Sequence, residues 1–359
     1  MVRPVVLAVT MALTAFGSPQ AQETPKETYK IGLVAPLTGP FTSTGKQVVA
    51  GAQFYLQQNG NTVAGKRIEL VIKDDAGIAD QTRRLVQEFI VNDKVNAIAG
   101  FGLTPLALAA APLATQSKTP MIVMAAATSI VTERSPYIVR TSFAQAQPVV
   151  VIADWQARHG MKRVVSMVSD FAPGYDSETF FKDSFTRAGG QVVEALRIPL
   201  QNPDFAPFLQ RARDATPDGL FVFVPAGQAA ALMRQFVERG LDKSGIRLFG
   251  AGDLTDDDTL NNMGDVMLGT VTAYFYSAAH PSEKNRAFVD GVRKANNDMR
   301  ANFFAVSGYD GMHVVYEALR KTAGFPTPSL SWRRRAHRHR SSPRSSSTPH
   351  RRHAFRRSR

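Results

Sequence analysis

Residues 29–36 read YKIGLVAP, and residues 37–45 read LTGPFTSTG. The first stretch is an apolar run with the length of a buried strand, and the second is a loop rich in Thr, Gly and Pro. A helical pattern follows at 46–59, with apolar residues repeated on one face. A buried strand, a loop and a helix in this order form the first half of a βαβ unit. The stretch therefore predicts an α/β fold with parallel strands.

The same alternation continues along most of the chain. Further strands are predicted at 67–74, 95–99, 120–124, 163–168, 191–197, 219–224, 247–250 and 270–276, and further helices at 81–92, 106–116, 147–159, 176–188, 205–215, 228–239, 283–296 and 307–321. The pattern restarts after a segment near 137–147, which we interpret as a crossing between two α/β blocks. We predict a first lobe at 29–142, a second lobe at 143–276, and a hinge return with helices that pack on the lobes at 277–324.

The chain begins with a short basic and apolar segment. Arg3 precedes an apolar run from Val5 to Phe16, and small residues follow up to Ala21. This composition is typical of a secretory signal peptide, because the apolar run is shorter than the roughly 20 residues that a membrane span needs. We expect a signal peptide at 1–21. A buried or anchoring N-terminal helix is the alternative.

The end of the chain has a different composition. Residues 325–359 contain 11 Arg, no Lys and no acidic residue, so they carry 11 of the 13 net positive charges and residues 1–324 carry only +2. The segment has no apolar periodicity, and it buries too little apolar surface to offset its chain entropy. We predict a basic disordered tail. It is either an Arg-rich arm for nucleic acid or an anionic membrane, or the product of a shifted reading frame in GC-rich coding sequence; we favour the second and expect no nucleic-acid partner.

Motifs of several enzyme classes are missing. The chain contains no cysteine, which excludes disulfides, thiol catalysis and cysteine-ligated zinc. It contains no Walker sequence and no GxSxG, and Gly100-Phe101-Gly102 lacks the third glycine of a dinucleotide-binding loop. The histidines at 159, 280 and 313 have no metal-ligand spacing. We predict a protein that is not an enzyme and that has neither a cofactor nor a metal.

Three of the predicted loops that follow strands are rich in small residues and hydroxyls. They lie at 36–45, 100–105 and 125–129. In α/β sheets, ligands bind at the loops beyond the carboxyl ends of the strands. Small residues let a ligand approach the backbone, while hydroxyls and helix N-terminal N–H groups suit a carboxylate. Helix capping explains any one such loop, but three on one edge favour a carboxylate pocket.

Several stretches, taken in order, are similar to one family. They are IGLVAPLTGPFTSTG at 31–45, Gly51-Ala52-Gln53, Lys73–Ala76, the loop after Ala99, MIVMAAAT at 121–128, SDFAPGY at 169–175 and LFGAGD at 248–253. Their order and spacing resemble the leucine/isoleucine/valine-binding family of periplasmic receptors, over Tyr29–Gly324. The resemblance implies a two-lobed type I periplasmic binding fold. Each lobe would be a mainly parallel sheet flanked by helices, with a hinge and a ligand between the lobes.

The resemblance also implies ligand contacts on the first lobe. The family's carboxylate-binding positions fall on Ala126, on Thr128 and near Thr104, and Leu103 shares the last of these positions. A hydroxyl at Thr128 would donate to the carboxylate, and the small side chain of Ala126 would let the ligand reach the backbone.

Aromatic and second-lobe contacts follow from the same resemblance. An aromatic residue of the first loop would fall at Thr44, where this chain has no ring, and nearby Phe41 is the candidate substitute. The second lobe offers Phe171 and Pro173, with Tyr175 close by, and the edge Pro225-Ala226-Gly227.

The position that determines the ligand class departs from the family pattern. The family's amino-acid binders hold the ligand ammonium with an acidic side chain, and the matching position here is Gly252, beside Asp253. Asp253 either takes this role or begins the acidic run to Asp258 that caps a helix. The ligand is therefore a branched-chain amino acid or, as in the aromatic-acid-binding branch of the family, an aromatic acid.

Together these features predict a monomeric receptor in the periplasm. It would bind a small carboxylate between its lobes and deliver it to an ABC permease in the inner membrane. A ligand-sensing regulatory module of the same fold is the alternative.

Overall fold

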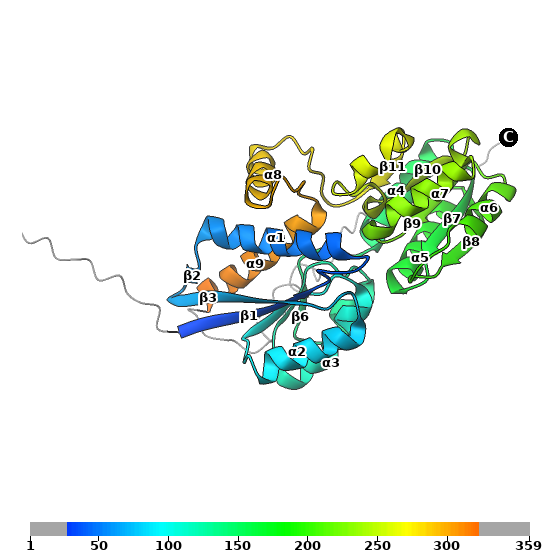
Figure 1. Ribbon diagram of the computed structural model, residues 1–359. Helices are drawn as coiled ribbons and strands as arrows, with labels where there is room; N and C mark the ends of the chain where they lie inside the picture. Colours follow the sequence, from blue (N-terminus) through cyan, green and yellow to red (C-terminus); the bar gives the residue numbers. More distant parts are fainter. Residues whose placement is uncertain (1–26, 323–359) are drawn as a thin grey trace, which may run out of the picture.

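The computed structural model describes residues 27–322, which form two α/β lobes (Figure 1). The predicted signal peptide and the predicted basic tail lie outside the described residues. Within 27–322, no helix has both the length and the apolar character that a membrane crossing requires.

The first lobe is built on a six-stranded sheet with the strand order β2-β3-β1-β4-β5-β6. Its strands are β1 (Glu27–Ala35), β2 (Thr62–Val63), β3 (Lys66–Asp74), β4 (Ala97–Gly100), β5 (Met121–Val123) and β6 (Ile138–Arg140). All neighbouring pairs are parallel except β2 with β3. The apolar run at 31–35 is fully buried in β1, because helices cover both faces of a parallel sheet.

Helices of the first lobe include two from the end of the described chain. The lobe contains α1 (Thr42–Asn59), α2 (Ala79–Val91), α3 (Thr104–Ser117), α8 (Glu283–Ala295) and α9 (Phe303–Lys321). Figure 1 shows α9 running beside α1. The backbones come unusually close, since a Cβ at Gly51 would lie 1.8 Å from the carbonyl oxygen of Ala305. Any larger residue at position 51 would push α9 away from the lobe.

The second lobe is built on a five-stranded parallel sheet with the order β11-β10-β9-β7-β8. Its strands are β7 (Arg163–Ser169), β8 (Gln191–Ile198), β9 (Gly219–Phe223), β10 (Arg247–Ala251) and β11 (Val271–Ala273), and its helices are α4 (Ala146–Arg158), α5 (Ala172–Arg187), α6 (Ala206–Asp214) and α7 (Ala229–Glu238). Stacked rings of Phe181 and Phe221, with centroids 4.1 Å apart, lie in its core.

The chain crosses between the lobes twice within the described residues. It passes from β6 to α4 through residues 141–145, and it returns from β11 to α8 through residues 274–282. The predicted crossing near 137–147 contains β6, a three-residue strand that the sequence pattern did not reveal.

Hydrogen bonds from side chains also link the two lobes outside these crossings. Asp176 on α5 accepts hydrogen bonds from the Thr128 hydroxyl (2.9 Å) and from the backbone N–H of Ser129 (2.8 Å). Arg300, between α8 and α9, donates to Asp257, between β10 and β11 (3.0 Å). The lobes are therefore in contact, as in a closed binding protein.

Candidate ligand site between the lobes

A cavity lies between the lobes, at the carboxyl ends of strands from both sheets. It is lined by Thr44, Gly102, Leu103, Thr104, Ala125, Ala126, Ala127, Phe143, Gln145, Phe171, Pro173, Phe223, Pro225, Ala226, Asp253, Tyr274 and Phe304. This is the place where α/β sheets hold ligands, because the strand-to-helix loops of both lobes converge there.

The first-lobe wall is made of backbone and small side chains. The loop after β4 places Gly102 and Leu103 at the cavity, and the loop after β5 places Ala125–Ala127 there. Helix α3 begins at Thr104 and has Pro105, which has no N–H, as its second residue. The first turn therefore offers the N–H groups of Thr104 and Leu106, which lack partners within the helix, and its positive dipole end lies at the cavity. This wall suits an anionic group.

Thr104 adds a hydroxyl to the same wall. Its Oγ1 is buried and accepts a 3.4 Å hydrogen bond from the N–H of Thr128. Because Oγ1 is the acceptor in this contact, its own proton stays available for a ligand oxygen.

The opposite wall is aromatic. Phe171 and Phe223 of the second lobe stack with ring centroids 6.0 Å apart, and Phe143 packs against Tyr274 at 4.5 Å. Phe304, at the start of α9 in the first lobe, also lines the cavity. Flat apolar walls of this kind favour a planar apolar ligand body.

Among residues 27–322, Asp253 is the one acidic side chain that lines this cavity. It is 6% exposed, and its Oδ2 accepts a 2.9 Å hydrogen bond from the Tyr274 hydroxyl. Burial raises the pKa of Asp253 to about 7, although the Tyr274 hydrogen bond opposes this rise. Burial, together with the nearby Asp253 charge, also raises the pKa of Tyr274 well above its usual range. Tyr274 is therefore a neutral donor, and the Asp253 carboxyl has lone pairs left for a further donor.

Gly252 precedes Asp253, and the Tyr274 ring covers it. A Cβ at position 252 would lie 2.5 Å from Cγ of Tyr274. The position that matches the family's ammonium-binding acid therefore has no room for a side chain. The sequence left open whether Asp253 begins a helix-capping run; its side chain instead binds Tyr274, and the short helix at Gly252–Thr255 has no side-chain cap.

Seven of the nine predicted site residues line this cavity: Thr44, Leu103, Thr104, Ala126, Phe171, Ala226 and Asp253. The other two do not. Phe41 is buried against Leu103 and Leu106, beneath the first-lobe wall. The Thr128 hydroxyl turns away to donate to Asp176 in the second lobe. Likewise, the N–H of Ala126 is already bonded to the carbonyl of Phe101, at 3.0 Å.

Five lining residues were not predicted from the sequence: Phe143, Gln145, Phe223, Tyr274 and Phe304. Phe143, Gln145 and Tyr274 lie in or beside the two crossing segments, and Phe304 belongs to a helix that returns to the first lobe. Phe143 and Gln145 lie in the crossing predicted at 137–147, and Phe223 lies at the carboxyl end of the strand predicted at 219–224, whereas no local pattern marks Tyr274 or Phe304.

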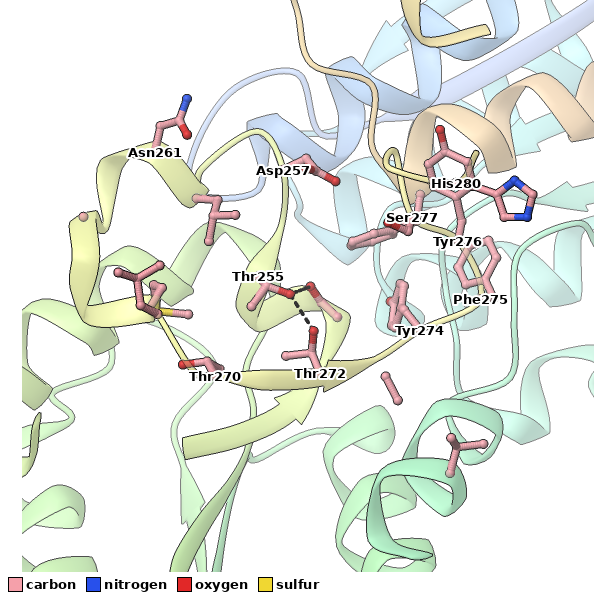
Figure 2. A pocket seen from close by; sticks show the side chains of 18 of the residues that line it. Thr255, Asp257, Asn261, Thr270, Thr272, Tyr274, Phe275, Tyr276, Ser277 and His280 are labelled. Carbon is pink, nitrogen blue, oxygen red and sulfur yellow. Dashed lines mark hydrogen bonds between the residues drawn. The ribbon is translucent and has the colours of Figure 1, made fainter. Parts of the chain in front are cut away.

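A wider groove lies beside β11, and Figure 2 shows its side chains. The hydroxyls of Thr255 and Thr272 share a 2.7 Å hydrogen bond on its floor. Tyr274 lines both this groove and the cavity between the lobes.

Comparisons with known proteins agree with this architecture. Residues 28–331 match the family described as "Periplasmic binding protein". Leu/Ile/Val-binding protein homolog 6 of Brucella abortus is 42% identical over 320 residues, covering 88% of this chain and 82% of that protein.

Two solved structures are also similar. A solute-binding protein of an ABC transporter from Rhodopseudomonas palustris BisB5, in complex with 3,4-dihydroxybenzoic acid, is 60% identical with a TM-score of 0.82, covering 84% of this chain and 83% of that one. A second, from R. palustris in complex with 4-hydroxybenzoate, is 38% identical with a TM-score of 0.81 and the same coverage.

The chain therefore belongs to the periplasmic binding protein family. Its fold is the type I periplasmic binding fold, and it is a solute-binding protein of an ABC transporter, as the resemblance in the sequence predicted. The family consists of receptors for solutes that ABC transporters carry.

Proposed function

We propose that this protein binds a hydroxylated benzoate between its lobes. The observation that carries the proposal is the Tyr274 ring on Gly252, which fills the place of the acid that would hold an amino-acid ammonium. The aromatic wall suits a benzene ring, and Asp253 is already bonded to Tyr274 and has a raised pKa, which makes it a poor partner for a cation.

In this proposal each wall of the cavity binds one end of the ligand. The ligand carboxylate lies against the first turn of α3 and accepts a hydrogen bond from Thr104. The ring lies among Phe143, Phe171 and Phe223. A ring hydroxyl at the far end donates to Asp253, so the ligand carries a donor there in place of an ammonium.

The remaining site residues have supporting roles. Leu103, Ala126 and Ala226 shape the walls, and Thr44 borders the first-lobe side. Phe41 packs beneath Leu103. Thr128 links the lobes through its hydrogen bond to Asp176. In this proposal it does not contact the ligand.

The transport role supports a location outside the inner membrane. We infer that it is exported to the periplasm as a monomer and passes its ligand to an ABC permease without chemical change. Family membership supports this assignment.

Isothermal titration calorimetry with four ligands tests the proposal. Benzoate, 4-hydroxybenzoate and 3,4-dihydroxybenzoate should bind, and L-leucine should give no heat. Tight binding of leucine with no binding of the benzoates would overturn it.

A further inference from the structure

The backbones of the two lobes touch at Gly227. This glycine lies in the short helix Ala226–Gln228, which follows β9 of the second lobe. A Cβ at this position would lie 2.1 Å from the carbonyl oxygen of Pro40, in the loop that joins β1 to α1 of the first lobe. A side-chain carbon does not approach a backbone oxygen so closely, so the contact requires that residue 227 is a glycine.

The second lobe by itself leaves room for a side chain at this position. The three atoms nearest to an added Cβ belong to Pro40 and Phe41, so none of them comes from the second lobe. Gly227 is also outside the left-handed backbone region, in which other residues are strained. An alanine at position 227 would therefore fit the second lobe and would collide with the first lobe when the lobes close.

Two further contacts hold the same loop against the second lobe. The hydroxyl of Ser43 donates to Oδ2 of Asp258 at 2.6 Å. The apolar cluster that contains Phe41 packs against Leu200, which follows β8. Residues 39–43 thus contact the second lobe through the backbone, through an apolar cluster and through a hydrogen bond.

We propose that Gly227 is a positioning residue for solute capture. Because it has no side chain, residues 39–43 can reach the second lobe and complete the closure of the cleft. A larger residue would hold the lobes apart, and ligand affinity falls with the population of the closed form. This inference does not depend on which solute binds.

Single-molecule energy transfer between two dyes measures closure directly. The chain has no cysteine, so Arg83→Cys on α2 and Asp183→Cys on α5, both at exposed positions, can carry the dyes. With saturating 4-hydroxybenzoate, the labelled protein should populate a compact state, and the ligand-free protein should populate the same state to a smaller extent. Adding Gly227→Ala should lower the ratio of compact to open molecules by roughly 5- to 100-fold in both conditions, since overpacking of this kind is costly.

Gly240→Ala is the matched glycine control. Gly240 has a φ of 68°, and an added Cβ there would have no atom within 4 Å, so alanine strains the backbone without touching the other lobe. This control should lower the melting temperature and leave the compact fraction unchanged, whereas Gly227→Ala should do the reverse. Ser43→Ala removes a single hydrogen bond between the lobes and should lower the ratio by about two- to tenfold.

The outcomes separate this inference from the proposed function. A compact fraction in Gly227→Ala equal to that of the protein with Gly227 would overturn the inference, and so would a protein that never becomes compact with or without 4-hydroxybenzoate. If calorimetry shows that no benzoate binds, the proposed function fails alone, because the ligand-free populations still compare glycine with alanine at position 227.

Discussion

The two walls of the cavity consist of different chemical groups. The first-lobe wall consists of backbone, alanines and the Thr104 hydroxyl, at the start of α3. The second-lobe side, with its crossing segments, supplies the rings of Phe143 and Phe171 and the carboxyl of Asp253. The first wall suits carboxylates in general, because backbone N–H groups bind a negative charge whatever the shape of the rest of the ligand. In the proposed function, the second wall therefore determines which carboxylate binds.

The largest loss of ligand affinity is expected for a substitution in the first wall. Thr104→Val should weaken benzoate, 4-hydroxybenzoate and 3,4-dihydroxybenzoate alike, by roughly 10- to 100-fold. A hydrogen bond to a charged group contributes about 1.5–3 kcal/mol, and about 1.4 kcal/mol corresponds to tenfold in affinity. Calorimetry on the three ligands measures this. Thr128→Val is the matched control and should cost less, because its hydroxyl donates to Asp176. A larger loss in the control would show that the carboxylate lies elsewhere.

A substitution in the second wall should weaken the binding only of ligands that carry a ring hydroxyl. In Asp253→Asn one neutral oxygen replaces two carboxylate oxygens, so the hydrogen bond from the ligand hydroxyl is no longer strengthened by the acceptor's charge. We expect 4-hydroxybenzoate to bind about tenfold more weakly and benzoate to bind equally well or better, because a negative charge near an anion has been removed. Titrations of both ligands decide the matter. Equal losses for benzoate and 4-hydroxybenzoate would contradict the division between the walls.

The contact that joins the two walls should have a smaller and unselective effect. Asp176→Ala removes the acceptor that Thr128 and Ser129 share across the cleft. This destabilises the closed state and should weaken all ligands by about two- to tenfold, because affinity falls with the population of the closed form. Faster ligand dissociation, measured by stopped flow, would show this loss of the closed state. Asp183→Ala, an exposed position on the same helix, is the control and should leave the rates unchanged.

The smallest expected effect is the dependence of folding stability on pH. Burial raises the pKa of Asp253 to about 7 and that of Asp256 to about 6, compared with about 3.9 in an unfolded chain. The folded protein then holds more protons than the unfolded chain between about pH 4 and 7. The stability from these groups is complete below about pH 4 and is lost as the pH rises to about 7.

Melting temperatures of the benzoate-saturated protein, compared at about pH 5 and pH 7.5, test this sign. Asp253→Asn should lose less stability over this range than wild type. Identical pH slopes would show that the Asp253 carboxyl is solvated in the folded protein.

Local patterns predicted most of the fold, with errors at the ends of elements. The apolar runs at 31–35 and 219–223 became central buried strands, since a continuous apolar run must be covered on both faces. Helix α1 begins at Thr42, four residues earlier than predicted, because Thr, Ser and Gly in its first turn look like loop residues. The strand β6 was missed since three residues give no periodicity.

The sequence by itself determined the α/β alternation, the loops at the carboxyl ends of the strands and the family, because each depends on residues close together in the chain. Only the tertiary structure decided where side chains of the site point. Thr128 turns to Asp176, 48 residues away, and Tyr274 covers Gly252 and binds Asp253. Hydrogen-bond partners and ring contacts of this kind are set by how the lobes pack, and packing brings together residues that no local pattern connects.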